Sequence, residues 1–181
     1  LLWSHPVQRG CAFDPGDAPL VGLAEMAKGK AERSPWPDCS YYYGHSAAAV
    51  VANGVVYAGA LDGKLRALDA RNGRACAGFG NRGVVTLAEH ARYGLEKVSS
   101  SSAPVVANGV VVVGSSIIDF AYAEAPRGVI ATYDAVTGAP RWTFDPLQGA
   151  TGTGAANAWA PVSVDAGRDL VFVPTGAPSP D

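Results

Sequence analysis

A repeat of about 55 residues is the feature that most constrains the fold of this 181-residue chain. Residues 46–59 (SAAAVVANGVVYAG) are matched by residues 101–114 (SSAPVVANGVVVVG), and each copy carries Asn-Gly between two runs of apolar, mostly β-branched residues. Asn and Gly tolerate the positive φ needed at both central positions of a two-residue hairpin turn, so each copy predicts a β-hairpin. A third copy begins within residues 159–176 (WAPVSVDAGRDLVFVPTG).

The second half of the unit repeats as well. Residues 64–73 (KLRALDARNG) match residues 129–138 (VIATYDAVTG), and both end in Asp-x-x-x-Gly. This ending predicts a further turn, capped by Asp69 in the first copy and by Asp134 in the second. Because turn capping explains why both carboxylates recur, we assign no catalytic role to Asp69 or Asp134.

A fourth strand is expected after each of these turns, beginning at Phe79 in the first copy and at Trp142 and Phe144 in the second. Four strands per unit at this period are typical of a β-propeller blade. A propeller closes with about four or more blades, which removes its open sheet edges. The sequence therefore predicts an all-β, incomplete propeller of about three four-stranded blades. Its predicted parts are an initial segment and loop (1–45), two blades (46–100 and 101–156) and the start of another (157–181).

The composition agrees with a folded all-β chain. Apolar residues make up 48% of the sequence, and 22 Gly and 13 Pro supply frequent turns. A net charge of −2 gives no electrostatic reason to expect nucleic acid as a partner. The three cysteines form no CxxC or haem-binding motif, and a Cys11–Cys39 disulfide that leaves Cys76 free is one open arrangement.

Residues 64–73 and 128–146 (GVIATYDAVTGAPRWTFDP) resemble blade motifs of the pyrroloquinoline quinone (PQQ)-dependent dehydrogenases, and the resemblance extends from Trp3 to Asp181. It implies part of a periplasmic quinoprotein that oxidises a sugar, polyol or other alcohol by hydride transfer to PQQ. Electrons would leave to a quinone or cytochrome acceptor. The family's catalytic Asp belongs to a later blade, so the resemblance assigns no catalytic residue here and implies that these residues alone are inactive.

The resemblance also assigns cofactor-binding residues near the start of the chain. The segment HPVQRG (5–10) is similar to one in which an Arg before a Gly holds a cofactor carboxylate, which corresponds to Arg9. In the glucose dehydrogenase branch a His four residues earlier covers one cofactor face, which corresponds to His5. Adjacent cysteines, typical of the alcohol dehydrogenase branch, do not occur in the sequence. This favours the sugar or polyol branch.

Three further segments complete the implied site. Ser101, three residues before Pro104, and Ser116, in GSSIID (114–119), correspond to hydroxyl donors to the cofactor. Asp119 corresponds to a ligand of calcium or another hard divalent cation, which prefers oxygen ligands. Trp159 corresponds to the aromatic floor beneath the planar cofactor. Methanol dehydrogenases place a second metal ligand, Asn, where this chain has Ala177, so further metal oxygens must come from elsewhere.

Simpler interpretations of these residues remain open at the level of sequence. A loop carboxylate such as Asp119 is most often only solvated, and a Trp is more often packed in a core than stacked on a cofactor. A propeller of this repeat type can also serve as a non-enzymatic scaffold that binds other proteins. The remaining blades would come from the rest of the protein or from a second chain.

Overall fold

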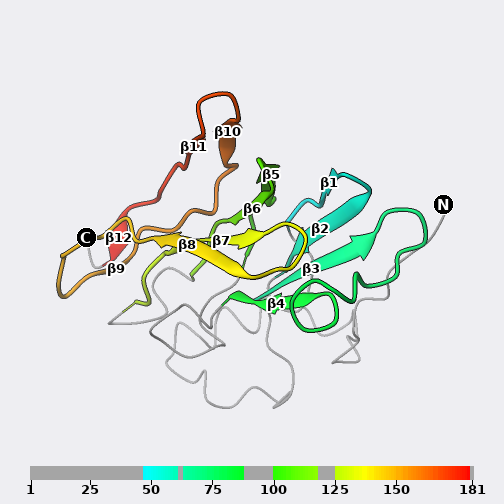
Figure 1. Cartoon of the computed structure of the whole chain (residues 1–181). Coiled ribbons are helices and arrows are strands. Elements are labelled where there is room, and N and C mark those ends of the chain that lie inside the picture. Colours follow the sequence, from blue (N-terminus) through cyan, green and yellow to red (C-terminus); the bar gives the residue numbers. More distant parts are fainter. Residues whose placement is uncertain (1–46, 61–62, 88–99, 118–124, 180–181) are drawn as a thin grey trace, which may run out of the picture.

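A computed structural model describes residues 47–60, 63–87, 100–117 and 125–179, whose regular secondary structure consists of strands (Figure 1). The sequence predictions for His5, Arg9, Cys11, Cys39 and Asp119 lie outside these residues. Within them, no helix has the length and apolar character needed to cross a membrane.

Two four-stranded antiparallel sheets form the body of the structure. The first has the order β1-β2-β3-β4, with strands Val50–Ala52, Val55–Gly59, Lys64–Asp69 and Val84–Thr86. The second has the order β5-β6-β7-β8, with strands Val105–Ala107, Val110–Val113, Ile130–Asp134 and Pro140–Phe144. A third unit contributes the hairpin β10 (Ser163–Asp165) and β11 (Leu170–Phe172), and β9 (Gly154–Ala155) pairs with β12 (Pro178–Ser179). The predicted all-β fold of consecutive four-stranded units is confirmed.

The two Asn-Gly turns have the predicted backbone conformation. Asn53 and Gly54 have φ values of 49° and 78°, and Asn108 and Gly109 have φ values of 47° and 76°. Positive φ at both central positions matches the twist of the flanking strands, so each turn joins its two strands directly. Val51 therefore pairs with Val56, and Val106 pairs with Val111, which fixes the register of both hairpins.

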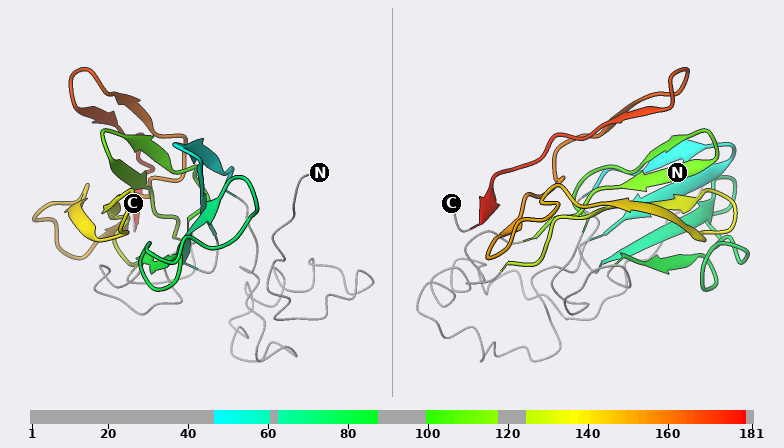
Figure 2. Two further views of the ribbon diagram at one scale, coloured as in Figure 1. Left: turned by 45° about the vertical axis from the view of Figure 1, so that its right-hand side comes forward. Right: turned by 60° about the vertical axis from the view of Figure 1, so that its left-hand side comes forward.

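The two sheets stack face to face around one apolar core (Figure 2). In β6, Val111 and Val113 point into this core, whereas Val112 belongs to a second core shared with Ala158 and Val162 near the third unit. This alternation follows from the two-residue period of a strand. The first core is formed from both sheets by Tyr57, Leu65, Ala67, Phe79, Val85, Leu87, Val111, Val113, Ala131 and Tyr133.

The innermost strands of the three units lie side by side. Strand β5 contacts β1 on one side and β10 on the other, and the remaining strands of each sheet follow outward (Figures 1 and 2). This is the arrangement of consecutive propeller blades. Large apolar side chains remain exposed on the outer strand β8 and on β11, namely Trp142, Phe144, Leu170 and Phe172.

Antiparallel strands place successive connections at alternate ends of the blades. We call one end the turn end; it carries the turns at 53–54, 108–109, 135–138 and 166–169. We call the other the loop end; it carries the described residues 100–104, 114–117 and 154–161 (Figure 2). Every predicted site residue that the structure describes lies at the loop end.

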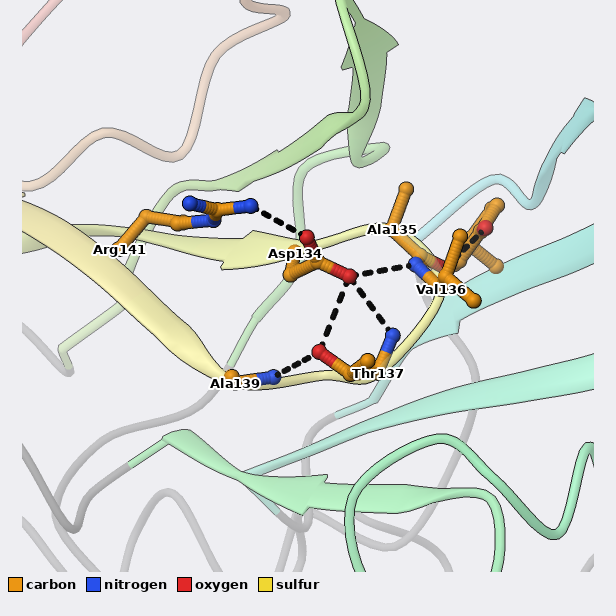
Figure 3. A network of polar contacts seen from close by, with 7 residues as sticks. Asp134, Ala135, Val136, Thr137, Ala139 and Arg141 are labelled. Atoms are coloured by element: carbon orange, nitrogen blue, oxygen red, sulfur yellow. Dashed lines mark hydrogen bonds and ion pairs between the residues drawn. The ribbon is translucent and has the colours of Figure 1, made fainter.

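The predicted aspartate caps are confirmed at the turn end. Asp134 Oδ1 accepts hydrogen bonds from the backbone N–H groups of Val136 (3.0 Å) and Thr137 (2.8 Å), and Asp134 Oδ2 pairs with Arg141 (2.6 Å; Figure 3). Asp69 Oδ1 accepts two backbone N–H groups in the equivalent turn of the first sheet. The Thr137 N–H, followed by Arg141 and the Thr137 hydroxyl, holds the pKa of Asp134 well below its ordinary value.

The prediction that Phe79 begins a strand is wrong. Phe79 lies in a turn before β4, which begins only at Val84, and its side chain is fully buried. Gly80 and Gly83 have φ values of 50° and 94°, which interrupt an extended backbone. The Phe79 ring instead packs edge-on against Tyr57, with ring centroids 5.9 Å apart, at the centre of the core between the sheets. Trp142 and Phe144 lie in β8, as predicted.

The Asp134 network makes stability depend on pH in acid. Because the pKa is lower in the folded state, this stabilisation is present above the ordinary carboxyl pKa and is lost as the pH falls below it. We expect Asp134→Asn to reduce the fall in melting temperature between about pH 5 and pH 2, measured by circular dichroism. Arg141→Ala should reproduce part of this change. An unaltered pH dependence in both variants would contradict the assignment.

Candidate functional site

Three of the six predicted site residues lie in the described structure, and all three are at the loop end. Ser101 precedes β5, Ser116 follows β6, and Trp159 precedes β10. They come from three separate connections of the second and third units. The other three residues, His5, Arg9 and Asp119, lie outside the residues that the structure describes.

Trp159 is carried by residues 154–159, which we call the platform segment. On one side, Ala155 donates its N–H to Pro126 O (2.7 Å) and accepts from Gly128 N–H (2.6 Å). On the other side, Ala156 donates to Ala177 O (3.2 Å), and Asn157 O accepts from Gly176 N–H (2.8 Å). The platform segment is therefore held between the approach to β7 and the chain that leaves β11.

Glycines allow the backbones around the platform segment to approach very closely. A Cβ added to Gly114 would overlap the carbonyl oxygen of Ala158, and one added to Gly128 would lie 2.5 Å from the carbonyl oxygen of Ala155. A Cβ on Gly154 would overlap Ala125 O. Side chains at these three positions would push the platform segment away from the second sheet.

Two consecutive non-glycine residues of the platform segment have left-handed backbone conformations. Ala155 and Ala156 have φ values of 55° and 54°. Such a conformation costs about 1–2 kcal/mol for an L-residue, so the surrounding hydrogen bonds must maintain it. Backbone strain of this kind is often found at functional sites, and here it lies directly before Asn157 and Trp159.

The Trp159 side chain is 58% exposed although it belongs to this tightly held segment. Its Nε1 edge lies over Gly176, where an added Cβ would lie 3.3 Å from Nε1. A large, planar and apolar surface is thus offered to solvent from a backbone fixed on both sides. This arrangement suits stacking against a flat conjugated ligand.

Asn157 is a site residue that sequence reasoning did not assign. Its side chain is buried, and Nδ2 donates a hydrogen bond to the carbonyl of Ile117 (2.9 Å). This bond ties the connection that carries Ser116 to the platform segment that carries Trp159. Asn is seldom buried without such a bond, but its sequence position beside Trp159 does not reveal the partner 40 residues away.

The serines before β5 differ in exposure: two of their hydroxyls are buried, and the one between them is accessible. Ser100 and Ser102 are buried, and Ser100 Oγ donates to Ser102 O (3.3 Å). The Ser100 N–H donates to Ala60 O (3.1 Å), which joins the first unit to the second at the loop end. Ser101 between them is only half-buried. Exposure is therefore consistent with Ser101, rather than either neighbour, as the hydroxyl available to a ligand.

Ser115 carries a buried hydroxyl without a hydrogen-bond partner among the described residues. The residue is 4% exposed, and it lies between Gly114 and Ser116 at the end of β6. A buried hydroxyl left unpaired costs about 1–3 kcal/mol. This part of the loop end therefore retains unused hydrogen-bonding capacity.

The residues with perturbed pKa values, apart from Asp134, lie between the sheets and away from the platform segment. Burial, followed by the charges of Cys76 and Asp134, raises the pKa of Tyr57, whose hydroxyl donates to Ala135 O (2.7 Å). Burial and then Asp69 raise the pKa of the Cys76 thiol. In the described ranges, no group of three His, Cys, Asp or Glu residues could hold a metal ion.

The fold and the loop end define the class of this protein: consecutive blades of an incomplete β-propeller with an exposed aromatic platform at one end. A family model for the β-propeller domain of PQQ-dependent glucose, ethanol and alcohol dehydrogenases matches residues 28–181. The chain belongs to this family, and the predicted family and fold class are confirmed.

Relatives and solved structures agree with this assignment. Quinoprotein glucose dehydrogenase A of Acinetobacter calcoaceticus is 38% identical over 131 residues, which cover 66% of this chain and 16% of that protein. Quinate/shikimate dehydrogenase (quinone) of Acinetobacter baylyi is 36% identical over 70% of this chain and 17% of that protein. The crystal structure of quinohemoprotein alcohol dehydrogenase from Comamonas testosteroni matches with a TM-score of 0.61 and 26% identity, covering 73% of this chain and 21% of that one. The chain thus spans 16–17% of the length of these two curated relatives.

The close backbone packing predicts a strong effect of a single methyl group. Gly114→Ala in the full-length protein should lower the free energy of unfolding by about 1–3 kcal/mol, because the new Cβ overlaps Ala158. Gly78→Ala is the matched control, since nothing lies within 4 Å of its added Cβ. Thermal unfolding compares the two variants. Equal melting temperatures would show that the junction can relax and does not fix the platform segment.

The unpaired hydroxyl of Ser115 predicts that its removal raises the free energy of unfolding, in contrast to Gly114→Ala. Ser115→Ala removes a buried polar group that gains no partner from the described residues. We expect the ligand-free protein to become more stable by about 1 kcal/mol, measured by urea unfolding. A loss of stability of similar size would mean that the hydroxyl is already paired in the ligand-free protein.

Proposed function

We propose that this chain is part of a periplasmic PQQ-dependent dehydrogenase that oxidises a sugar, polyol or other alcohol. Family membership supports the cofactor, and the names of the relatives, which are glucose and quinate/shikimate dehydrogenases, support the substrate class. Electrons would pass to a quinone or cytochrome acceptor. These same findings favour an enzyme over the alternative of a protein-binding scaffold.

The observation that carries this proposal is the exposed indole of Trp159 on a rigidly held segment. An aromatic ring on a backbone held in this way offers one broad apolar surface to a flat ligand, and little backbone freedom is lost on binding. Asn157 links this surface to the connection that bears Ser116, so an aromatic plane and a hydroxyl belong to one bonded unit. Among the described residues, Trp159 and Ser116 therefore suit a PQQ site: the first offers an apolar face and the second a hydroxyl group.

The remaining residues have roles that follow from their chemistry. Arg9 would form a bidentate ion pair with a carboxylate of the cofactor, and His5 would cover one cofactor face. The hydroxyls of Ser101 and Ser116 would donate hydrogen bonds to its polar rim. When bound, PQQ supplies the quinone that accepts hydride from the substrate. The base that takes the substrate proton would come from residues after Asp181.

Asp119 would supply one carboxylate to calcium or another hard cation, which binds oxygen ligands. Ala177, whose carbonyl already accepts the N–H of Ala156, has no side-chain oxygen to add. The other ligands would then come from the cofactor, from solvent or from later residues of the full-length protein.

Substitution of Trp159 tests the stacking role. Trp159→Ala in the full-length protein should weaken PQQ binding by about 10- to 100-fold, because stacking on an aromatic ring contributes about 1–3 kcal/mol. Trp159→Phe should retain part of the affinity. PQQ binding can be followed by equilibrium dialysis of the apoprotein. The control is Trp142→Ala, which removes a similarly exposed Trp from β8. Equal losses for both tryptophans would contradict stacking at Trp159.

Titration with calcium tests the metal ligand. Asp119→Ala should raise the calcium concentration needed to restore PQQ-dependent dye reduction with glucose, polyols or short alcohols, because a carboxylate ligand is lost. Asp165→Ala serves as a control, since this carboxylate caps the β10–β11 turn at the turn end. If Asp119→Ala requires no more calcium than the parent, Asp119 is not a ligand.

A further inference from the structure

The guanidinium of Arg127 binds three acceptors along the connection that follows β8. Its Nη1 donates to Asp145 Oδ2 (2.9 Å) and to Leu147 O (2.6 Å), and its Nη2 donates to Ala150 O. The Arg127 side chain is 19% exposed, so these bonds form in a partly desolvated place. One side chain thus fixes the course of residues 145–150.

The backbone around Arg127 holds the other end of the same connection. Arg127 and Ala155 form a parallel β-bridge, in which Pro126 O and Gly128 N–H bond to the two polar groups of Ala155. Gly149, just before the last acceptor of Arg127, and Gly152, just after it, have φ values of 75° and 72° and no atoms within 4 Å of an added Cβ. Residues 149–152 therefore have little packing of their own to define their path.

We propose that Arg127 is a positioning residue for Trp159, an inference that rests on the proposed PQQ site. The Arg127 side chain holds residues 145–150, which lead into the left-handed pair Ala155–Ala156, and this pair sets the direction of the chain into Asn157 and Trp159. Loss of the guanidinium releases residues 145–150 and leaves the strained pair to its main-chain bonds with Pro126, Gly128 and Ala177. The platform segment then orients the indole less strictly for a ligand to stack on.

Arg127 acts through geometry and not as a charge offered to the cofactor. Its charge is compensated by Asp145, and its Nη groups already donate to a carboxylate and two carbonyls. Only the planar fork of a guanidinium reaches three acceptors in this arrangement, because a Lys ammonium is a single compact centre. Arg127→Lys therefore keeps the charge and loses the attachment.

The experiment measures the dissociation constant of PQQ for the full-length apoprotein and its variants by equilibrium dialysis, well below their melting temperatures. We expect Arg127→Ala and Arg127→Lys each to weaken PQQ binding about tenfold, as for other residues that orient a ligating group. Arg141→Ala is the matched control: it also breaks an Arg–Asp pair of the second sheet, but at the turn end. PQQ affinity should be unchanged in this control, and an equal loss there would overturn the inference.

A double-mutant cycle tests whether Arg127 acts through Trp159. In a Trp159→Ala background, Arg127→Ala should cause little further loss of PQQ affinity, because the side chain that it orients is absent. A full tenfold loss in this background would mean that Arg127 contacts the cofactor itself, which contradicts a positioning role.

Asp145→Asn tests the inference through the direction in which PQQ affinity changes. Removing this carboxylate weakens the attachment of residues 145–150, so a positioning role predicts weaker PQQ binding. If Arg127 held a cofactor carboxylate directly, loss of its competing partner would instead strengthen PQQ binding, and the inference would fail.

The parent protein separates failure of the inference from failure of the proposed function. If the parent binds PQQ and Trp159→Ala weakens that binding, but both Arg127 variants bind as the parent does, only the role of Arg127 is wrong. If the parent does not bind PQQ, the proposed function and this inference are both wrong.

Discussion

The close contact between backbones at Gly114, Gly128 and Gly154 is the constraint on which the loop end depends. Because no Cβ separates the backbones at these positions, the polar groups of the platform segment can bond to neighbouring backbone on both sides. That bonding maintains the left-handed Ala155–Ala156 pair, and this pair sets the course of the chain into Trp159. A solvent-exposed indole is thereby carried by a backbone that is bonded on both sides.

The two ends of the blades have different tasks although the units repeat. At the turn end, Asp69, Asp134 and Asp165 each cap a turn through backbone N–H groups. Bonds such as Tyr57 Oη to Ala135 O also join neighbouring sheets near that end. The aspartate caps are local and occur in each unit, whereas the Tyr57 bond links two sheets, and both stabilise the propeller. The loop-end connections differ from one another, which leaves that end available for a binding site that no single unit could form.

Local sequence signals predicted much of the fold. Asn53-Gly54 and Asn108-Gly109 specified their hairpins because the required positive φ is a property of these residue types. The prediction failed at Phe79, where the repeat suggested a strand but glycines at 80 and 83 bend the chain and the ring fills the core between two sheets. A contact between two sheets cannot be predicted from the sequence pattern around one residue. The division of the chain into parts at residues 45, 100 and 156 remains a prediction.

The candidate site was predicted less completely than the fold. The resemblance to a known family indicated Ser101, Ser116 and Trp159, and the topology brings them to one end of the blades. It did not indicate Asn157 or Arg127, whose partners are separated from them by 40 and by 18 to 23 residues. Nor do alanines at 155 and 156 suggest a left-handed backbone, since alanine has no preference for it. Such features arise only from the packing of several connections.

A crystal structure of the full-length protein with bound PQQ would show which residues the cofactor contacts. We expect the cofactor ring to lie parallel to the Trp159 indole at van der Waals distance, about 3.5–4 Å, at the loop end and beside the connection that carries Ser116. A cofactor bound at the turn end, or at the loop end without contact to Trp159, would contradict it.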